Sequence, residues 1–315
     1  MPSPISGHSS LISLLLAMLI AVGAYVRLSL NPMPIELAET SFLPRWMEIV
    51  AAVFALMATS IVVERVSVKM GALRGFTSLP MPIYMIVACG IFATPNALTA
   101  SVAAFLSAMG VMLLLRAYNH FGSKNSVFFA GLLLGAAAII YPPSVVFVLL
   151  LVVAVVQSPL NWRQSIVGFT GWLLPILTAS YCYWYAGNDF KDVAEAIYAS
   201  LARTENAFPL TPFPVVGAIM AGLVAIILVI GVVMIAVNRY AMLGKARKAL
   251  SFELILLGVL LGALFIPACG ISVLPLLAIP VATISAYAIE SLPSPVSASL
   301  YWALLLIYSL HLFVA

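Results

Sequence analysis

Residues 214–238 read PVVGAIMAGLVAIILVIGVVMIAVN, a stretch that contains no acidic or basic side chain. A helix of this length crosses the hydrocarbon core of a bilayer, which takes about 20 apolar residues. A strand does not fit such a run, because backbone amides in lipid must find hydrogen-bond partners within the protein. The stretch therefore predicts a transmembrane helix.

The rest of the chain has the same apolar character. Of its 315 residues, 64% are hydrophobic and 8% are charged, and only 3 are cysteine. Soluble domains average about 25% charged residues, so this chain has too few charges to cover a water-exposed surface. These proportions exclude a soluble enzyme, a disordered chain and a disulfide scaffold. They indicate a polytopic membrane protein.

Apolar runs predict an all-α bundle of about eleven spans that forms one integral-membrane domain over residues 1–315. The first run lacks a basic leader, since the first Lys or Arg is Arg27, so we expect an uncleaved helix rather than a signal peptide. The predicted spans are 10–29, 46–63, 81–94, 97–115, 127–141, 144–157, 165–186, 214–238, 251–267, 270–289 and 298–314.

Basic residues are distributed unevenly between the two sets of predicted loops. One set holds ten Lys and Arg residues and the other holds four, which are Arg27, Arg45, Lys191 and Arg203. Short cytoplasmic loops are enriched in Lys and Arg, so we expect a bacterial inner-membrane protein with a cytoplasmic N-terminus. The net charge of +4 is then a topological signal and does not indicate a nucleic-acid partner. The ten bases are Arg65, Lys69, Arg74, Arg116, Lys124, Arg163, Arg239, Lys245, Arg247 and Lys248.

The first of two long outer loops, residues 30–45, carries a pair of acids. Glu36 and Glu39 are three residues apart, so one helical turn places both carboxylates on the same face. Such a pair suits a general base or a metal ligand, although two solvated glutamates fit the sequence as well. Arg27 and Arg45 stand at the two ends of this loop. They can bind a phosphate or contact lipid headgroups.

The second long outer loop, residues 187–213, contains an amphipathic segment between Asp189 and Glu205. Its apolar side chains have the spacing of one helix face, and Arg203 suits the last turn of such a helix. The segment is too polar to span, so we expect a helix that lies flat on the outer membrane surface. It either covers a cavity between the spans or acts only as an anchor.

A few polar and aromatic side chains stand out within the spans. Tyr183 and Trp184, at the outer end of span 165–186, suit an interfacial aromatic belt or stacking against a sugar or an isoprenoid chain. Glu253 is the third residue of its predicted span, and we interpret it as a boundary residue that pairs with Lys248 or Arg247. The three histidines are dispersed, so no metal site and no cofactor are predicted from them, and a divalent metal at the paired glutamates stays open.

These features follow one another in a familiar order. A first span that ends in Arg27 precedes an acidic outer loop with Glu36 and Glu39, and a stretch over 113–187 follows. Over residues 10–210 this order resembles the GT-C superfamily of integral-membrane glycosyltransferases, which use polyprenyl-phosphate-linked sugars. The quoted stretch comprises Leu-Leu-Leu-Gly-Ala-Ala-Ala at 132–138, Tyr-Pro-Pro at 141–143, Asn-Trp-Arg at 161–163 and Tyr-Ala-Gly at 185–187.

The resemblance implies that the chain transfers a sugar from a polyprenyl phosphate at the outer face of the membrane. Carried over, Glu36 or Glu39 is the general base that activates an acceptor hydroxyl. The loop departs from the family's pattern, because it contains no Asp and its two acids are not adjacent. The implied substrate-binding residues are Arg27, Arg45 and Arg203 for the lipid phosphate, and Tyr183 and Trp184 for the sugar or isoprenoid. Residues 211–315 add C-terminal helices.

Other interpretations stay open at this point. The chain is also similar to a family of small polytopic bacterial inner-membrane proteins, a resemblance that implies no activity. A non-catalytic subunit or scaffold of a larger envelope complex is the alternative to an enzyme, and a transporter is a third. The sequence leaves open whether the chain is catalytic.

Overall fold

The structure is a computed structural model, and it describes residues 10–30, 44–73, 78–90, 98–119, 124–157, 162–202, 215–265 and 273–314. Within these residues the chain is all-helical and contains no strand. Both short irregular helices continue into, or out of, an α-helix: the π-helical turn η1 follows α3, and the 3-10 helix η2 precedes α6. The elements are α1 (Ser10–Leu30), α2 (Arg45–Lys69), α3 (Pro80–Met85), η1 (Ile86–Gly90), α4 (Leu98–Asn119), α5 (Lys124–Ile140), η2 (Pro142–Phe147), α6 (Val148–Gln157), α7 (Trp162–Tyr185), α8 (Asp192–Ala202), α9 (Val215–Val237), α10 (Gly244–Ala263), α11 (Leu274–Ser291) and α12 (Ser294–Val314).

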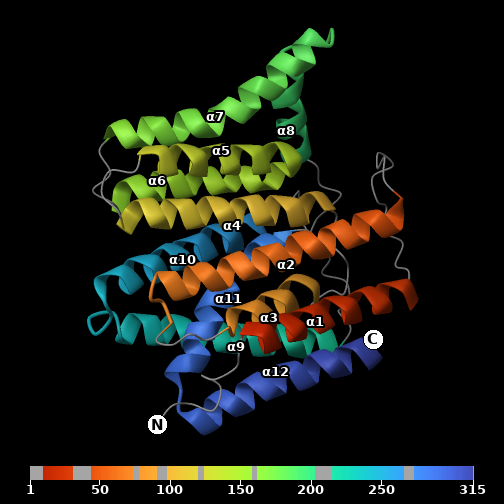
Figure 1. Ribbon diagram of the computed structural model, residues 1–315, viewed down its shortest axis with the longest axis vertical. Coiled ribbons are helices and arrows are strands. Elements are labelled where there is room, and N and C mark those ends of the chain that lie inside the picture. The colour runs from red at the N-terminus through yellow and green to blue at the C-terminus, as the bar shows by residue number, and fades with distance from the viewer. Residues whose placement is uncertain are drawn as a thin grey trace.

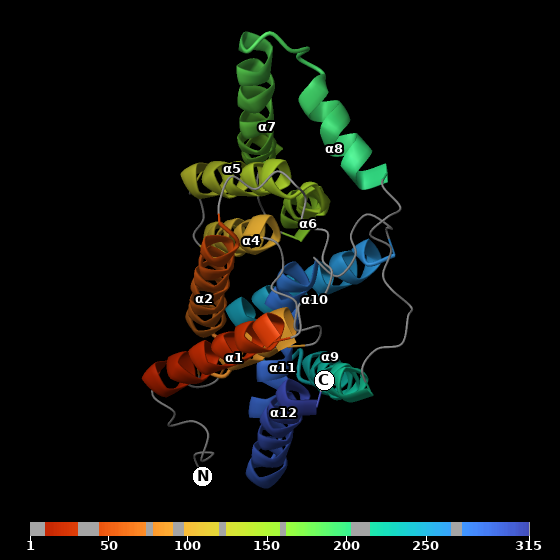
Figure 2. The same cartoon turned by 90° about the vertical axis from the view of Figure 1, so that its right-hand side faces the viewer.

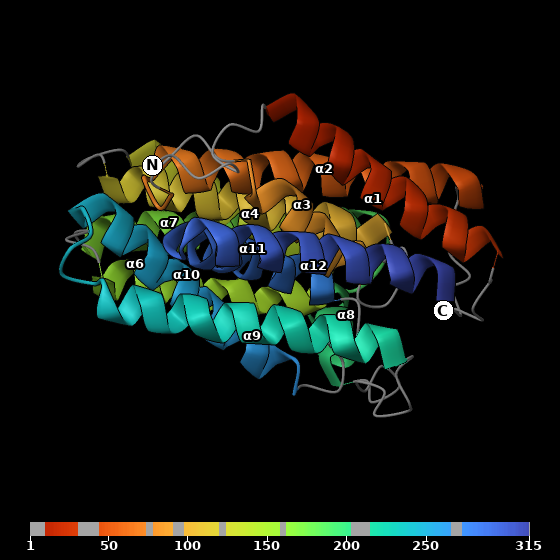
Figure 3. The same ribbon diagram turned by 90° about the horizontal axis from the view of Figure 1, so that it is seen from below.

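The long helices lie side by side along one direction and form an elongated stack, with α7 at one edge and α12 at the other (Figure 1). Successive helices run in opposite directions, so the connections alternate between the two ends of the bundle (Figures 1 and 3). We call the end that holds Leu30, Arg45 and Tyr185 the acidic end, and the end that holds Lys69 and Trp162 the basic end. This alternation is the one expected of a chain that crosses a bilayer repeatedly.

Each of the predicted apolar runs contains a helix, which confirms the all-α class. By length and composition, 6 helices within the described residues are suited to cross a membrane. Four further apolar segments are shorter, among them Pro80–Cys89 and Asn125–Ile140. The count of about eleven crossings therefore stays a prediction, while a multi-pass helical arrangement is supported.

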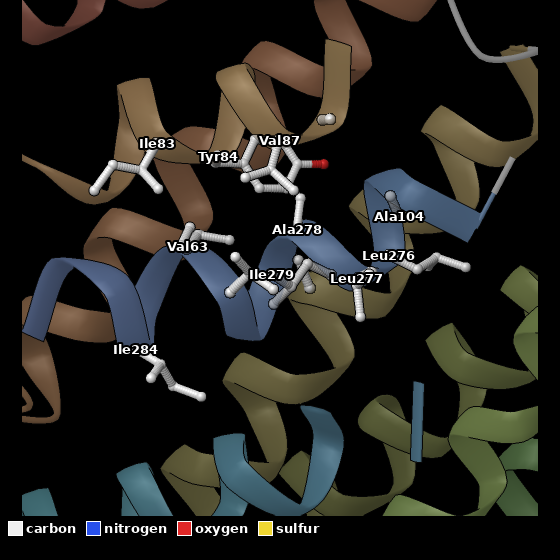
Figure 4. Close-up of a cluster of buried hydrophobic side chains, with 14 of the residues drawn as sticks. Val63, Ile83, Tyr84, Val87, Ala104, Leu276, Leu277, Ala278, Ile279 and Ile284 are labelled. Atoms are coloured by element: carbon white, nitrogen blue, oxygen red, sulfur yellow. The ribbon is translucent and has the colours of Figure 1, made fainter. Parts of the chain in front are cut away.

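Helix α11 forms the centre of the bundle. It packs against α2, α3, α4, α9, α10 and α12, and 16 of its 18 residues are buried. Figure 4 shows Ala278 and Ile279 of α11 facing Tyr84 and Val87 on one side and Val63 on another. A helix that is surrounded in this way has almost no lipid-facing surface. The Thr283 hydroxyl donates to the Ile279 carbonyl at 3.3 Å, while the buried hydroxyls of Ser285 and Tyr287 have no hydrogen-bond partner in the described part of the chain.

Glycines allow α5 and α7 to pack with their backbones in contact. A Cβ atom added at Gly131 would overlap the Gly168 carbonyl oxygen, and one added at Gly135 would overlap the Trp172 carbonyl oxygen. From the other side, a Cβ at Gly171 would overlap the Phe128 carbonyl oxygen. Small residues spaced by four let membrane helices approach this closely, where van der Waals contact rather than hydrophobic burial drives association.

Helix α1 packs mainly against α3 and η1, and less against α2 and α12. The Tyr308 hydroxyl of α12 donates a hydrogen bond to the Ile20 carbonyl of α1 at 2.6 Å, and Gly23 leaves room for the Leu312 side chain. Because α1 packs mainly against α3 and η1, it meets α2 over only a small part of its length.

Candidate functional site

The two ends of the bundle differ in charge. Nine of the ten bases assigned to the larger set lie within the described residues, and all nine stand at or next to helix termini of the basic end (Figure 1). Glu48, Asp189, Asp192 and Glu195 lie at the opposite end. The predicted partition of charge is therefore a property of the folded bundle.

An apolar groove of about 470 Å³ opens between α1 and α2. Its lining runs from Ile49 to Ile61 on α2 and from Met18 to Val22 on α1, and every lining side chain that the structure describes is apolar. Small side chains at Ala21 and Ala58 form part of the lining. The space stays open because α1 packs mainly against α3 and η1 and makes little contact with α2.

The groove begins close to the acidic end. At 1.5 Å per residue, Ile49 lies about 6 Å along α2 from Arg45, and the stretch from Ile49 to Ile61 is about 18 Å long. One leaflet of a bilayer core is about 15 Å thick, so the length of the groove is comparable to the thickness of one leaflet. It opens sideways where Phe54 and Met18 are 72% and 53% exposed. A hydrocarbon chain from the lipid phase can enter there without crossing a polar barrier.

The first long loop joins the ends of α1 and α2 at the acidic end. Arg27 lies in the last turn of α1, and Arg45 is the first residue of α2, so the positions of both predicted arginines are at the acidic end. Glu36 and Glu39, together with Arg203, lie outside the described residues. Their assignment as catalytic and phosphate-binding residues stays a prediction.

The aromatic residues at the acidic end of α7 lie far from the groove. Tyr183 and Trp184 are 48% and 56% exposed, and the Trp184 ring stands 5.9 Å from that of Tyr181, centroid to centroid. Figure 2, which views the acidic end, places α4 and α5 between α2 and α7. Exposed aromatics at a helix end fit an interfacial belt. The structure thus separates them from the ends of α1 and α2, where the predicted arginines lie.

Helix α8 confirms the amphipathic helix that the sequence predicts between Asp189 and Glu205 in the second long loop. It runs across the acidic end, at a steep angle to the bundle direction, and packs against α7 and η2 (Figures 1 and 2). Its start is fixed by the Asp192 carboxylate, which accepts a hydrogen bond from the Asp189 amide at 3.1 Å, as in a capping box. Before it, Gly187 has φ +93° and ends α7, the conformation that favours glycine at a helix C-terminus.

Glu253 is placed differently from its predicted boundary position. Helix α10 begins at Gly244, seven residues before the predicted span, so Glu253 is its tenth residue and is only 2% exposed. The helix starts early because its first turns keep Lys245 and Arg247 exposed while Ala246, on the other face, is buried. Glu253 continues this buried face, with the helical spacing Ala246, Ala249, Leu250, Glu253, Leu257 and Leu260. That periodicity was the signal in the sequence that pointed to a buried carboxyl group.

Known proteins offer no direct comparison for this arrangement. The chain matches no family model, no curated protein and no solved structure. Among the described residues, no group of three or more His, Cys, Asp and Glu side chains can hold a metal ion. The α1–α2 groove, with the loop that joins its two helices, is therefore the candidate site.

Proposed function

We propose that the chain binds the hydrocarbon chain of a polyprenyl phosphate in the α1–α2 groove and transfers a sugar from that lipid at the outer face of a bacterial inner membrane. The observation that carries this proposal is the groove of about 470 Å³, in which every described lining side chain is apolar. Its volume is in the range of small-molecule sites. Its length is comparable to one leaflet, and the two helices that form it are the ones that the loop with the predicted acids connects.

In this mechanism each part of the chain has a separate task. The isoprenoid lies in the groove, and its phosphate rests at headgroup depth, where Arg27 and Arg45 flank the loop. Glu36 or Glu39 removes the proton of the acceptor hydroxyl as that oxygen bonds to the sugar's anomeric carbon. The bond from that carbon to the phosphate oxygen breaks, and the polyprenyl phosphate leaves with the bonding electron pair. The N-terminus is cytoplasmic in this orientation.

The catalytic part is tested by replacing both acids. We expect Glu36→Gln with Glu39→Gln to lower the release of polyprenyl phosphate from synthetic polyprenyl-phosphate-linked hexoses by roughly 10²–10⁴-fold, the usual contribution of a general base. The assay uses membranes of the producing cells, which supply the acceptor. Glu195→Gln on α8, at the same end of the bundle, is the matched control. Unchanged release in the double variant, with the protein at wild-type level, contradicts the assignment.

The groove is tested by filling it. Ala58→Trp places an indole among the groove's lining side chains, and we expect at least about tenfold less labelling by a photoreactive isoprenyl phosphate in nanodiscs, which corresponds to 1.4 kcal/mol. Val229→Trp on α9 is the control, because Val229 is 60% exposed and lies outside the groove. Equal labelling of the two variants would show that the probe enters with the general lipid and has no site between α1 and α2.

A non-catalytic membrane subunit is the second candidate, favoured by the exposure of α7. Only four of the 24 residues of α7 are buried: Gln164, Gly168, Gly171 and Ser180. The outer end of the helix leans away from the bundle (Figure 1). Such a helix offers a long surface to a partner in the membrane. If the chain is such a subunit, we expect the double variant Glu36→Gln and Glu39→Gln to leave both the protein and its cellular phenotype unchanged.

A further inference from the structure

We propose that Glu253 is a proton-binding site in the centre of the bundle, where its carboxylic acid group shares a small cavity with one water molecule and the Thr283 hydroxyl. The inference does not depend on the proposed transferase activity. It begins with position: Glu253 is the tenth residue of α10 and is 2% exposed. An ionisable residue within a membrane bundle is a functional candidate by default, because its burial is costly.

The cavity beside Glu253 has room for one small guest. Its volume is about 10 Å³, close to the smallest space that holds a water molecule. It is lined by α2, α4, α10 and α11, and all its lining residues other than Glu253 and Thr283 are apolar: Val62, Val63, Val66, Ala108, Val111 and Ile279. Figure 4 shows two of these side chains, Val63 and Ile279, beside each other in the core. A hydrated ion is too large for this space.

The hydroxyl groups around the cavity have no hydrogen atom left to donate into it. The Ser67 hydroxyl donates to the Val63 carbonyl at 2.8 Å. The Thr283 hydroxyl has one hydrogen, which it gives either to the Ile279 carbonyl at 3.3 Å or to the Ser67 oxygen at 3.2 Å. Thr283 therefore offers only lone pairs to the cavity. The Glu253 Oε2 atom is buried and has no hydrogen-bond partner in the described part of the chain.

A carboxylate in this place would face acceptors and hydrocarbon alone. Among the described side chains, no basic residue lines the cavity, and the charged and titratable residues of the elements that form it do not reach its lining. An uncompensated buried carboxylate costs several kcal/mol. Binding one proton from water forms an O–H bond on Glu253 and removes the charge. It also supplies the donor that the cavity water and Thr283 lack. The described side chains of this kind that stay outside the lining are Glu48, Glu64, Arg65 and Lys69 of α2, Arg116 of α4, Lys245, Arg247 and Lys248 of α10, and Tyr287 and Glu290 of α11.

Infrared spectroscopy of the full-length chain in nanodiscs at neutral pH tests the proposal. We expect a carboxylic acid C=O band that shifts in D2O, is lost in Glu253→Gln and is retained in the control Glu64→Gln. Thr283→Val should move the band to higher frequency, because the acid loses its hydrogen-bonded neighbour. If Glu253→Gln does not fold, ¹³C-labelled glutamate in the unmodified chain and the Thr283→Val shift still assign the band.

Two results would overturn the proposal. One is the absence of any carboxylic acid band that responds to Glu253→Gln or Thr283→Val, which would mean that the group is ionised. The other is a rise in melting temperature with Na⁺, but not with N-methylglucamine, that disappears in Glu253→Gln, since a bound metal cation then replaces the proton. A transferase activity that fails its own test changes neither result, because that activity rests on α1 and α2.

Discussion

Replacing Gly131 with leucine is expected to separate α5 from α7 and to prevent the chain from folding into a stable bundle. Even a single Cβ at this position overlaps the Gly168 carbonyl oxygen, and backbone atoms of α7 surround it. A flexible side chain can turn aside, but a helix backbone must move as a unit. Overpacking a core typically costs 1–3 kcal/mol, and we expect about 3 kcal/mol or more here. The measurement is thermal unfolding in detergent, together with the elution profile on size-exclusion chromatography.

The same substitution at Gly222 of α9 is the matched control. No atom lies within 4 Å of a Cβ atom added there. Leucine is a better helix former than glycine by roughly 0.8 kcal/mol, so Gly222→Leu should leave the melting temperature unchanged or raise it slightly. Gly171→Leu approaches the interface from α7 and should reproduce the loss. Equal stability of the Gly131 and Gly222 variants would mean that α5 and α7 do not pack with their backbones in contact.

The second large effect is an all-or-none difference between the two ends of the bundle in the labelling of single cysteines from outside the cell. In a chain whose three cysteines are replaced by alanine, we introduce Glu36→Cys, Glu195→Cys or Lys245→Cys one at a time. A membrane-impermeant maleimide added to intact spheroplasts should label the first two variants and not the third. The reason is that loops rich in Lys and Arg are retained in the cytoplasm, and the described bases of the larger set gather at the end of the bundle that contains Lys245.

Permeabilised spheroplasts provide the control, since all three cysteines should then react. Labelling of Glu36→Cys and Glu195→Cys from different sides would contradict the alternating arrangement of the helices. Labelling of both from the inside alone would reverse the orientation. It would also place the predicted acids where an outer-face reaction cannot use them.

Much of the architecture could be predicted because it depends on local properties of the chain. A run of apolar residues long enough to cross a bilayer becomes a helix whatever its neighbours are, since its amides have no other partners. The stretch at 214–238 accordingly became α9, and the amphipathic spacing between 189 and 205 became α8. The separation of Lys and Arg is likewise found by counting the bases in each predicted loop, so it could be predicted before the packing of the helices was known.

The packing of the helices could not be predicted from local sequence in this way, and the central helix α11 is the clearest case. Helix α9 is the more apolar of the two, yet much of it is exposed, while α11 has 16 of its 18 residues buried. Hydropathy cannot separate them, because lipid tails are as apolar as a protein core and do not drive apolar helices inward. Only the tertiary structure decided that α11 is enclosed.

The candidate sites also depend on contacts between distant segments. The groove exists because α1 packs mainly against α3 and η1 and little against α2, and nothing in residues 18–22 or 49–61 encodes that separation. Glu253 lay on a buried helical stripe that the sequence could have revealed, but its cavity is formed by side chains of α2, α4 and α11. The sequence by itself determined that this chain is a helical membrane protein with opposite charge at its two ends. Which surfaces meet, and what space they leave, was decided by packing, because every helix offers several apolar faces and only the assembled bundle selects among them.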